Sequence, residues 1–363
     1  MKTLTRSVLI TLATAALLAG SAGAYAARPP AAATRGPSPA AYDWQLTATG
    51  STASFRGLAP VSRDVAWVSG SVGTVLRTTD GGQTWLDVSP EGLGTETLQF
   101  RDIEATSDRD AVILSIGPGE DSRILVTDDG GASWTETFRN AEEAAFYNCL
   151  AFTTPKRGLA VSDPVDGVFR LAETTDGGQS WSVVDAPTAV AKPGEYGFSA
   201  SGTCIAESTG RRVHLATGGA DPARVLSSAD RGHTWTASET PVVGGEAAGI
   251  FSLSFKDAHR GVAVGGDYLD PTGAVDNAAW TADGGLTWHP ATTNPAGYRS
   301  GSAWLTHEHE TVLAVGPSGS DVSTDGGRTW TPFDDGSFDS VDCTLDGACW
   351  ASGTKGRVAV LSH

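Results

Sequence analysis

Three arginines in this sequence each follow directly after an aromatic residue, in the dipeptides Phe55-Arg56, Phe100-Arg101 and Tyr298-Arg299. A guanidinium presents a planar fork of N–H donors that binds a carboxylate, phosphate or sulfate in bidentate fashion. If the fold brings the three side chains together, they predict a site for an anionic ligand. Asp339, which follows Phe338, falls in the same pattern. The alternative is that each arginine pairs with an acidic neighbour, such as Asp102 or Asp339, and only links parts of the structure.

A second group of candidate residues consists of four aspartates in two turn-like segments, Asp163, Asp166, Asp267 and Asp270. Two carboxylates on either side of a glycosidic bond can hydrolyse it by acid–base or nucleophilic catalysis. The sequence does not single out a pair among the four. Aspartates are also common in ordinary turns, which is the interpretation that we favour.

Sequence motifs for cofactors and metals are not found. No glycine-rich GxGxxG segment follows a strand-like run, and there is no P-loop and no His/Cys cluster with zinc spacing. We therefore expect neither a cofactor nor a metal site, and no catalytic residue can be assigned.

The elements that must position these residues are indicated by an octet, Ser/Thr-x-Asp-x-Gly-x-Ser/Thr-Trp, which occurs six times. The octets begin at Thr78, Thr127, Thr174, Ser228, Thr281 and Ser323. Their aspartates, 42 to 54 residues apart, are Asp80, Asp129, Asp176, Asp230, Asp283 and Asp325. A repeat of this length accommodates one four-stranded sheet, which predicts a β-propeller made of such sheets, or blades.

Each octet is typical of a turn between two strands. The aspartate can accept hydrogen bonds from N–H groups of the turn, and the glycine tolerates a positive φ. The tryptophan then begins the returning strand and covers the hairpin. We therefore expect the six aspartates to be structural and not catalytic or metal-binding.

The octets resemble Asp-boxes, the repeat found in bacterial sialidases, sortilin-type receptors, xyloglucanases and propellers of the photosystem II stability and assembly factor-like family. A fuller repeat, Phe255 to Gly265 followed by Thr281 to Trp288, is similar to one blade of the assembly factor-like family. This resemblance extends from about Tyr42 to His363 and implies a propeller that acts as a binding scaffold. Sialidases hold a substrate carboxylate with three arginines, but their Arg-Ile-Pro signature is absent here.

Seven blades are expected in residues 42–363. The first six begin near Phe55, Phe100, Phe146, Phe198, Ile250 and Tyr298. The last, from Phe338, has only three strands and no octet, and its fourth strand is expected from Asp43 to Leu46. We thus predict an all-β, seven-bladed propeller of four-stranded antiparallel blades, closed by pairing of the N-terminal strand with the C-terminal blade.

This topology places the candidate residues on one face. If each octet joins the third and fourth strands of its blade, all octets lie opposite the face where the inner strands begin. The aromatic–arginine pairs lie where the inner strands of blades one, two and six begin, and Asp339 lies in blade seven. We therefore expect these residues to form one arc at the mouth of the central pore, with Asp163, Asp166 and Asp267 in loops on the same face.

The N-terminus is typical of an export signal. Residues 1–26 combine Lys2 and Arg6 with a short apolar run and an Ala-x-Ala site, and residues 27–41 resemble a disordered leader rich in Pro and Ala. The net charge of −17 becomes −19 once Lys2 and Arg6 are removed. This acidity argues against nucleic acid as a partner. We expect a secreted or cell-envelope monomer without a membrane span.

The four cysteines agree with export. Cys343 and Cys349 flank a predicted hairpin in the last blade, so a disulfide between them is geometrically easy. Cys149 and Cys204 occupy similar places in the inner strands of blades three and four, and we predict a second disulfide there. The alternative for this pair is two reactive thiols near the pore.

The function that follows from these features is binding. We expect a scaffold that captures a protein segment, a glycan or a small anionic ligand at the pore mouth through Arg56, Arg101 and Arg299. The alternative is a glycoside hydrolase of sialidase or xyloglucanase type, acting on an extracellular polysaccharide with the loop carboxylates.

Overall fold

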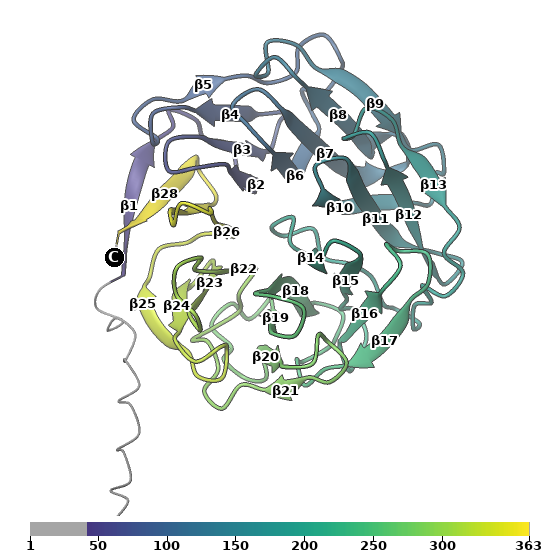
Figure 1. Cartoon of the computed structure of the whole chain (residues 1–363), viewed down its shortest axis with the longest axis vertical. Helices are drawn as coiled ribbons and strands as arrows, with labels where there is room; N and C mark the ends of the chain where they lie inside the picture. The colour runs from purple at the N-terminus through teal and green to yellow at the C-terminus, as the bar shows by residue number, and fades with distance from the viewer. Residues whose placement is uncertain (1–41, 363) are drawn as a thin grey trace, which may run out of the picture. The chain divides into compact units, whose positions relative to one another are not determined.

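The computed structural model describes residues 42–362, so the expected signal peptide and leader lie outside the described part of the chain. Strands β1 to β28 form seven four-stranded antiparallel blades around a central axis (Figure 1). Blades two and three are joined into one sheet by a short pairing between β7 and β10. The seven-bladed all-β propeller expected from the repeats is confirmed. No helix among residues 42–362 is long and apolar enough to cross a membrane.

The strands of each blade follow one another from the axis to the rim, except in blade seven. The innermost strands of blades one to seven are β2 (Phe55–Pro60), β6 (Gln99–Ala105), β10 (Phe146–Thr154), β14 (Ile205–Thr209), β18 (Ala248–Phe255), β22 (Gly301–Trp304) and β26 (Ser340–Cys343). The second strands are β3 (Ala66–Gly70), β7 (Ala111–Pro118), β11 (Arg157–Val165), β15 (Arg212–Ala216), β19 (Gly261–Asp267), β23 (Val312–Gly316) and β27 (Cys349–Ser352). The third strands are β4 (Val75–Thr78), β8 (Arg123–Thr127), β12 (Val168–Thr174), β16 (Arg224–Ser228), β20 (Ala278–Thr281), β24 (Gly319–Ser323) and β28 (Arg357–Ser362). The outermost strands are β5 (Leu86–Asp87), β9 (Thr135–Arg139), β13 (Ser182–Val184), β17 (Thr236–Glu239), β21 (His289–Pro290), β25 (Thr331–Asp334) and β1 (Asp43–Ala48).

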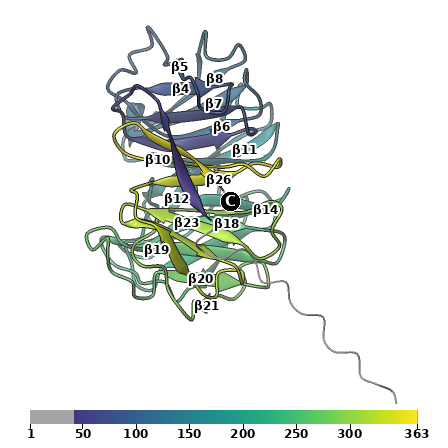
Figure 2. The same cartoon turned by 90° about the vertical axis from the view of Figure 1, so that its left-hand side faces the viewer.

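Blade seven combines both ends of the described chain. Strand β1 pairs with β28 from Asp43 opposite Ser362 to Ala48 opposite Arg357, and the two lie side by side in Figure 1 and in the turned view of Figure 2. Trp44 is buried in this strand and donates from Nε1 to the Ser320 hydroxyl of blade six at 3.0 Å. The N-terminal strand therefore completes the C-terminal blade, as predicted.

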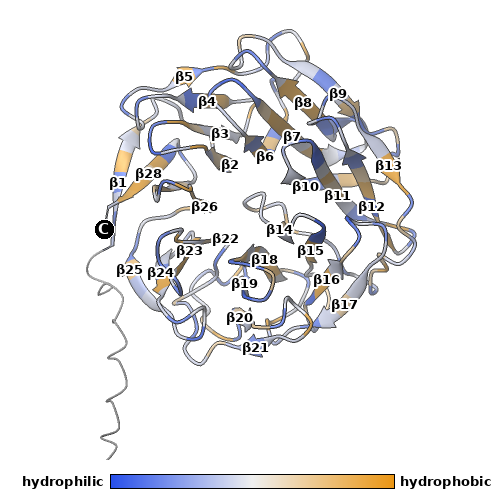
Figure 3. Ribbon diagram, in the orientation of Figure 1, coloured by the Kyte–Doolittle hydropathy of each residue, from blue (hydrophilic) through white to orange (hydrophobic). Residues whose placement is uncertain are grey.

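The core lies between neighbouring blades. The second strand β23 consists of small and aliphatic residues, and every residue of it is buried. Such side chains suit a sheet that is packed on both faces. In Figure 3 the apolar stretches, coloured orange, lie mainly on the strands, while the connecting loops are mostly white or blue.

The octets form the turns between third and fourth strands. In each octet, the aspartate Oδ1 accepts a hydrogen bond from the hydroxyl of the first octet residue at 2.7–2.9 Å. It also accepts one from the backbone N–H four residues after the aspartate at 2.8–3.0 Å. Its Oδ2 accepts the seventh-residue hydroxyl at 2.6–2.7 Å. Hydrogen bonds from Ser133 lower the pKa of Asp129 to about 2, with the bond from its hydroxyl having the larger effect and the bond from its N–H the next largest. Both carboxylate oxygens are thus occupied by the turn itself.

Blade four departs from the expected pattern. The sequence predicts that its inner strand begins at Phe198, but β14 begins at Ile205. Residues Phe198–Thr203, which we call the strap, instead cross the central channel and contact blades on the other side of the ring. The Ser201 hydroxyl, for example, donates to the Ser300 carbonyl of blade six at 2.6 Å. In Figure 1 the chain just before β14 reaches toward the middle of the ring.

Both predicted disulfides are confirmed. Cys343–Cys349 links β26 to β27 in blade seven. Cys149–Cys204 links β10 of blade three to the residue that follows the strap.

Candidate functional site

The pore-mouth pocket lies where the inner strands begin, on the face opposite the octets. It has a volume of about 380 Å³. Its charged lining residues are Arg56 from β2, Arg101 from β6 and Asp339, which precedes β26. The strap residues Phe198, Ser199 and Ala200 also line the pocket. The structure therefore brings together three of the four residues that the sequence placed on this arc.

The two arginines are held by carbonyl groups of the strap. Arg101 donates from Nη1 to the Ser199 carbonyl at 3.1 Å, which is the only hydrogen bond of its guanidinium within residues 42–362. Arg56 donates from Nη1 to the Ala200 carbonyl at 3.5 Å. Burial, and then the charge of Arg56, lower the pKa of Arg101 to about 10. Arg101 therefore stays charged at neutral pH, and most of the N–H donors of the two guanidiniums are available to a ligand.

Asp339 counters only part of this positive charge. Its Oδ1 lies 3.5 Å from Nη2 of Arg56, and its Oδ2 is buried without a hydrogen-bond partner. Burial raises the pKa of Asp339, although Arg56 and Arg101 act in the opposite direction. Two guanidiniums thus face one carboxylate, which leaves a local excess of positive charge in an acidic protein.

Aromatic side chains form the wall beside the arginines. Phe198 stacks on Phe251 with ring centroids 3.8 Å apart, and Tyr298 meets Phe251 edge to face at 4.7 Å. Tyr268, from the loop between β19 and β20, packs edge-on against both phenylalanines and is 47% exposed. The pocket therefore offers cationic donors next to an apolar surface.

Arg299 does not belong to this pocket, which corrects the expectation of three converging arginines. Its side chain is 1% exposed and donates from Nε to Asp321 Oδ2 at 2.6 Å, and from Nη1 to the Tyr298 carbonyl and the Ser318 hydroxyl. Asp321 is fully buried in β24, and a buried carboxylate requires a cationic partner. The alternative that an arginine pairs with an acidic residue therefore applies to Arg299. Asp102, which the sequence suggested as such a partner, accepts the Leu150 N–H and not an arginine.

Of the four aspartates that the sequence placed in loops, Asp163 lies in strand β11, and Asp267 and Asp270 have hydrogen-bond partners within their own loop. Asp163 Oδ1 accepts the Asn148 amide at 2.8 Å and the Gly197 N–H at 2.9 Å, and burial raises its pKa to about 6. Asp267 Oδ1 accepts the Leu269 N–H at 2.8 Å. Asp166 has a φ of 52° and is exposed in the turn between β11 and β12, and Asp270 accepts only the Thr272 hydroxyl at 3.3 Å. The local contacts of Asp267 and Asp270 agree with the interpretation as ordinary turns, whereas Asp163 connects β11 to segments 15 and 34 residues away.

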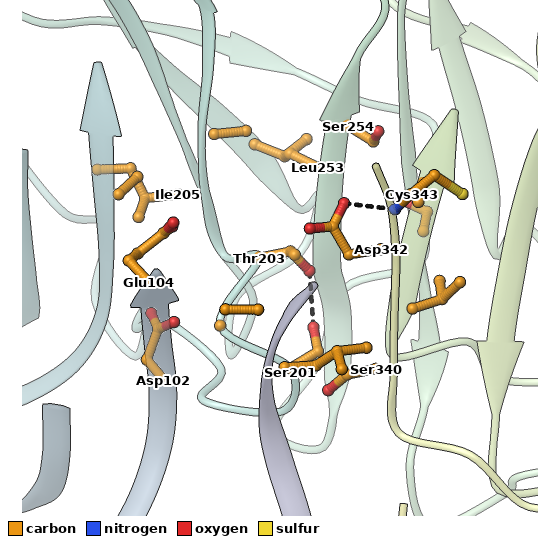
Figure 4. Close-up of a pocket in the computed structure, with 18 of the residues that line it drawn as sticks. Asp102, Glu104, Ser201, Thr203, Ile205, Leu253, Ser254, Ser340, Asp342 and Cys343 are labelled. Carbon is orange, nitrogen blue, oxygen red and sulfur yellow. Dashed lines mark hydrogen bonds between the residues drawn. The ribbon is translucent and has the colours of Figure 1, made fainter. Parts of the chain in front are cut away.

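A second cavity, of about 450 Å³, lies toward the other end of the channel. We call it the acidic chamber, because its lining includes Asp102, Glu104, Glu207 and Asp342. Figure 4 shows Asp102 and Glu104 on one wall and Asp342 on another, with the strap residues Ser201 and Thr203 between them. The strap lines both cavities and so lies between them.

The carboxylates of the acidic chamber are crowded together and repel one another, although only Asp102 is buried, while Asp342 and Glu207 are exposed within the channel. Desolvation by the surrounding channel wall raises the pKa of Asp342 to about 6. Burial, and then the charges of Asp102, Asp342 and Glu207, raise the pKa of Glu104 well above its usual range. This part of the channel therefore favours protonated carboxyl groups.

The acidic chamber was not predicted from the sequence, although a signal for it exists. Glu104 and Asp342 each lie four residues after the aromatic residue at which the sequence placed the start of the blade, Phe100 and Phe338. Acidic residues are rare in strands that pack at a propeller axis, so this repeated position marks a polar channel wall.

Comparisons with known proteins support the fold. No family model matches the chain, and no curated protein matches it. The structure of YCF48 bound to D1 peptide aligns with a TM-score of 0.64 at 17% identity, over 88% of this chain and 95% of that one. YCF48 from Cyanidioschyzon merolae aligns with a TM-score of 0.61 at 15% identity, over 88% and 98%. The WD40 propeller domain of Doa1 aligns at 0.55 and 12% identity, over 88% and 97%. The chain is thus a β-propeller that resembles YCF48, a photosystem II assembly factor, in its fold.

Proposed function

We propose that this protein is an exported binding scaffold that captures an acidic segment of a partner protein in the pore-mouth pocket. A carboxylate of the segment binds Arg56 and Arg101, and a neighbouring apolar side chain packs on the aromatic wall. No bond is made or broken in this function.

The observation that carries the proposal is the unbalanced charge of the pocket. Arg56 and Arg101 share one carboxylate, Asp339, at a distance of 3.5 Å from Arg56. A hydrogen bond to a charged group contributes about 1.5–3 kcal/mol, more than a neutral one. A ligand carboxylate therefore gains more here than at an exposed arginine, where water competes for the same donors.

An exposed apolar rim next to the pocket favours a protein segment over a small anion. The loop between β19 and β20, which contributes Tyr268 to the pocket wall, also presents Leu269 and Val275, which are 75% and 72% exposed. Interfaces place aromatic and aliphatic anchors beside a charged rim in this way. That YCF48 was solved with a D1 peptide shows that a propeller of similar fold binds a peptide.

The proposal is tested by selection from a displayed library of random decapeptides on the mature protein. We expect the selected peptides to carry Asp or Glu next to an aromatic or aliphatic residue. Changing that acid to its amide, or Arg101→Gln in the protein, is expected to raise Kd at least tenfold, or about 1.4 kcal/mol.

The matched control is Arg109→Gln. Arg109 is an exposed arginine in the turn between β6 and β7, on the octet face, so its loss leaves the pocket unchanged. Selected peptides without acidic residues, or equal affinity for the parent and Arg101→Gln, would contradict the proposal.

A further inference from the structure

The floor of the pore-mouth pocket is not part of a blade. It is the strap, whose residues Phe198, Ser199 and Ala200 line the pocket. The carbonyls of Ser199 and Ala200 are also the groups that orient Arg101 and Arg56. Anything that fixes or frees the strap therefore fixes or frees both binding arginines.

The strap lacks the support that the other inner strands have. Their first residues are hydrogen-bonded to the second strand, as Phe55 is paired with Gly70, but pairing in blade four begins only at Ile205 with Leu215. The strap depends instead on scattered contacts, such as the bond from Leu253 N–H to the Thr203 carbonyl at 2.9 Å. A segment without a ladder opens more easily than a strand.

Both ends of the strap are fixed to the same place in blade three. At the first end, Gly197 donates its N–H to Asp163, which also accepts the amide of Asn148 in β10. At the other end, Cys204 is bonded to Cys149, the next residue of β10. The strap is thus attached to blade three by a hydrogen bond at one end and by the disulfide at the other.

We propose that oxidation of Cys149 and Cys204 is the step that switches the pore-mouth pocket on. With the two cysteines reduced, the strap leaves the channel and Arg56 and Arg101 lose the carbonyls that orient them. On oxidation, the two thiols lose two protons and two electrons and form the S–S bond, while a low-molecular-weight disulfide accepts them and becomes two thiols. This inference rests on the proposed function, because it concerns the regulation of the same pocket.

The consequence is that binding competence depends on the compartment. Disulfides form in oxidising compartments and not in the cytosol. The chain acquires its pocket only where the pair is oxidised, so a partner segment is not captured before export. Both cysteines are fully buried, which slows reduction of the completed disulfide.

The chain contains its own control, because the second disulfide, Cys343–Cys349, joins β26 to β27 within one hairpin and is not bonded to the strap, although Cys343 also lines the acidic chamber. We would compare the variants Cys149→Ala/Cys204→Ala and Cys343→Ala/Cys349→Ala with the parent. Hydrogen exchange of the amides of residues 199–203 is expected to be at least tenfold faster in the first variant only. The Kd of a selected acidic decapeptide is expected to rise at least tenfold in that variant only.

A second measurement does not depend on the folding of a variant. The folded parent is treated with dithiothreitol, and thiol labelling of each pair is followed by mass spectrometry alongside decapeptide binding. Binding should disappear in step with labelling of Cys149 and Cys204, and persist while only Cys343 and Cys349 are labelled.

The outcomes separate the two proposals. Unchanged exchange in the strap, or full binding by chains with Cys149 and Cys204 reduced, would overturn the switch and leave the proposed function intact. If no acidic peptide binds the oxidised parent, the proposed function fails, and the switch of this pocket fails with it.

Discussion

Two arginines of the same dipeptide pattern have different roles at the residue scale. Arg299 and Asp321 form an ion pair removed from water, whereas Arg56 lies 3.5 Å from Asp339 beside an open pocket. A buried pair is strongly destabilised when one partner is lost, because the other charge remains buried. The role of each arginine therefore depends on whether its own guanidinium is buried with its carboxylate partner, as in Arg299, or borders an open pocket, as in Arg56.

Removal of Arg299 is expected to destabilise the fold. Arg299→Met should lower the free energy of unfolding by about 3–5 kcal/mol, and Arg299→Met/Asp321→Leu should regain most of this loss. Arg101→Met should change it by only about 1 kcal/mol. Urea denaturation measures all three, and a double variant as unstable as the single one would contradict this role.

The acidic chamber predicts how stability depends on pH. The pKa of Asp342 in the folded protein is raised to about 6, above its unfolded value. Its stabilising effect is therefore complete below about pH 4 and is lost as the pH rises through about 6. Glu104, whose pKa is also raised, acts in the same direction.

Neutral side chains in the chamber should remove this dependence. Asp342→Asn and Glu104→Gln are expected to reduce the drop in Tm between pH 5 and pH 8. Asp87→Asn, in the exposed strand β5, serves as the control. If the Tm of all three falls as steeply as that of the parent, the chamber carboxyl groups do not determine it.

At the scale of elements, the octet is a turn whose aspartate completes the hydrogen bonding. The second octet contains two adjacent aspartates, of which Asp129 accepts bonds from Thr127 and Ser133 while Asp128 is exposed. Asp129→Ala should lower Tm by several degrees, because two hydroxyls and an N–H lose their acceptor. Asp128→Ala should change it by no more than about one degree. Equal effects in a thermal scan would refute this assignment.

The sequence predicted most elements but not the strap. The octets predicted the positions of the third and fourth strands in six blades, because the hydrogen bonds of such a turn involve only residues close in sequence. Phe198 resembles the aromatic residues that begin other inner strands, yet Ser199 to Thr203 contains no β-branched residue before Thr203, and Gly202 has a φ of 77°. Strand propensity was therefore low there, and only contacts across the ring determine its path.

The site was predictable in part for a similar reason. Arg56, Arg101 and Asp339 follow from repeat position, which the octets set. Arg299 occupies the same position, but its partner Asp321 is 22 residues away on another strand. Such a pairing depends on packing, which the repeat pattern does not contain.

At the scale of the whole molecule, the ring depends on a strand from its N-terminal end. Chains that begin at residue 42 and at residue 50 differ only by β1 and its flanks. Without β1, strand β28 loses one of its two neighbouring strands and Phe333 loses its contact with the buried Trp44. We expect the longer chain to unfold in one cooperative transition and the shorter chain to lack it, as measured by calorimetry. A shorter chain that unfolds at the same temperature would contradict closure through β1.

The capture of an acidic segment is best tested by a double-mutant cycle across the pocket. Kd is measured for a selected peptide and its Glu→Gln form, each with the parent protein and with Arg101→Gln. We expect a coupling energy of at least about 1 kcal/mol between the peptide carboxylate and Arg101, as for charged groups in direct contact. Additive effects, with coupling near zero, would mean that the carboxylate binds elsewhere and that the pore-mouth pocket is not the capture site.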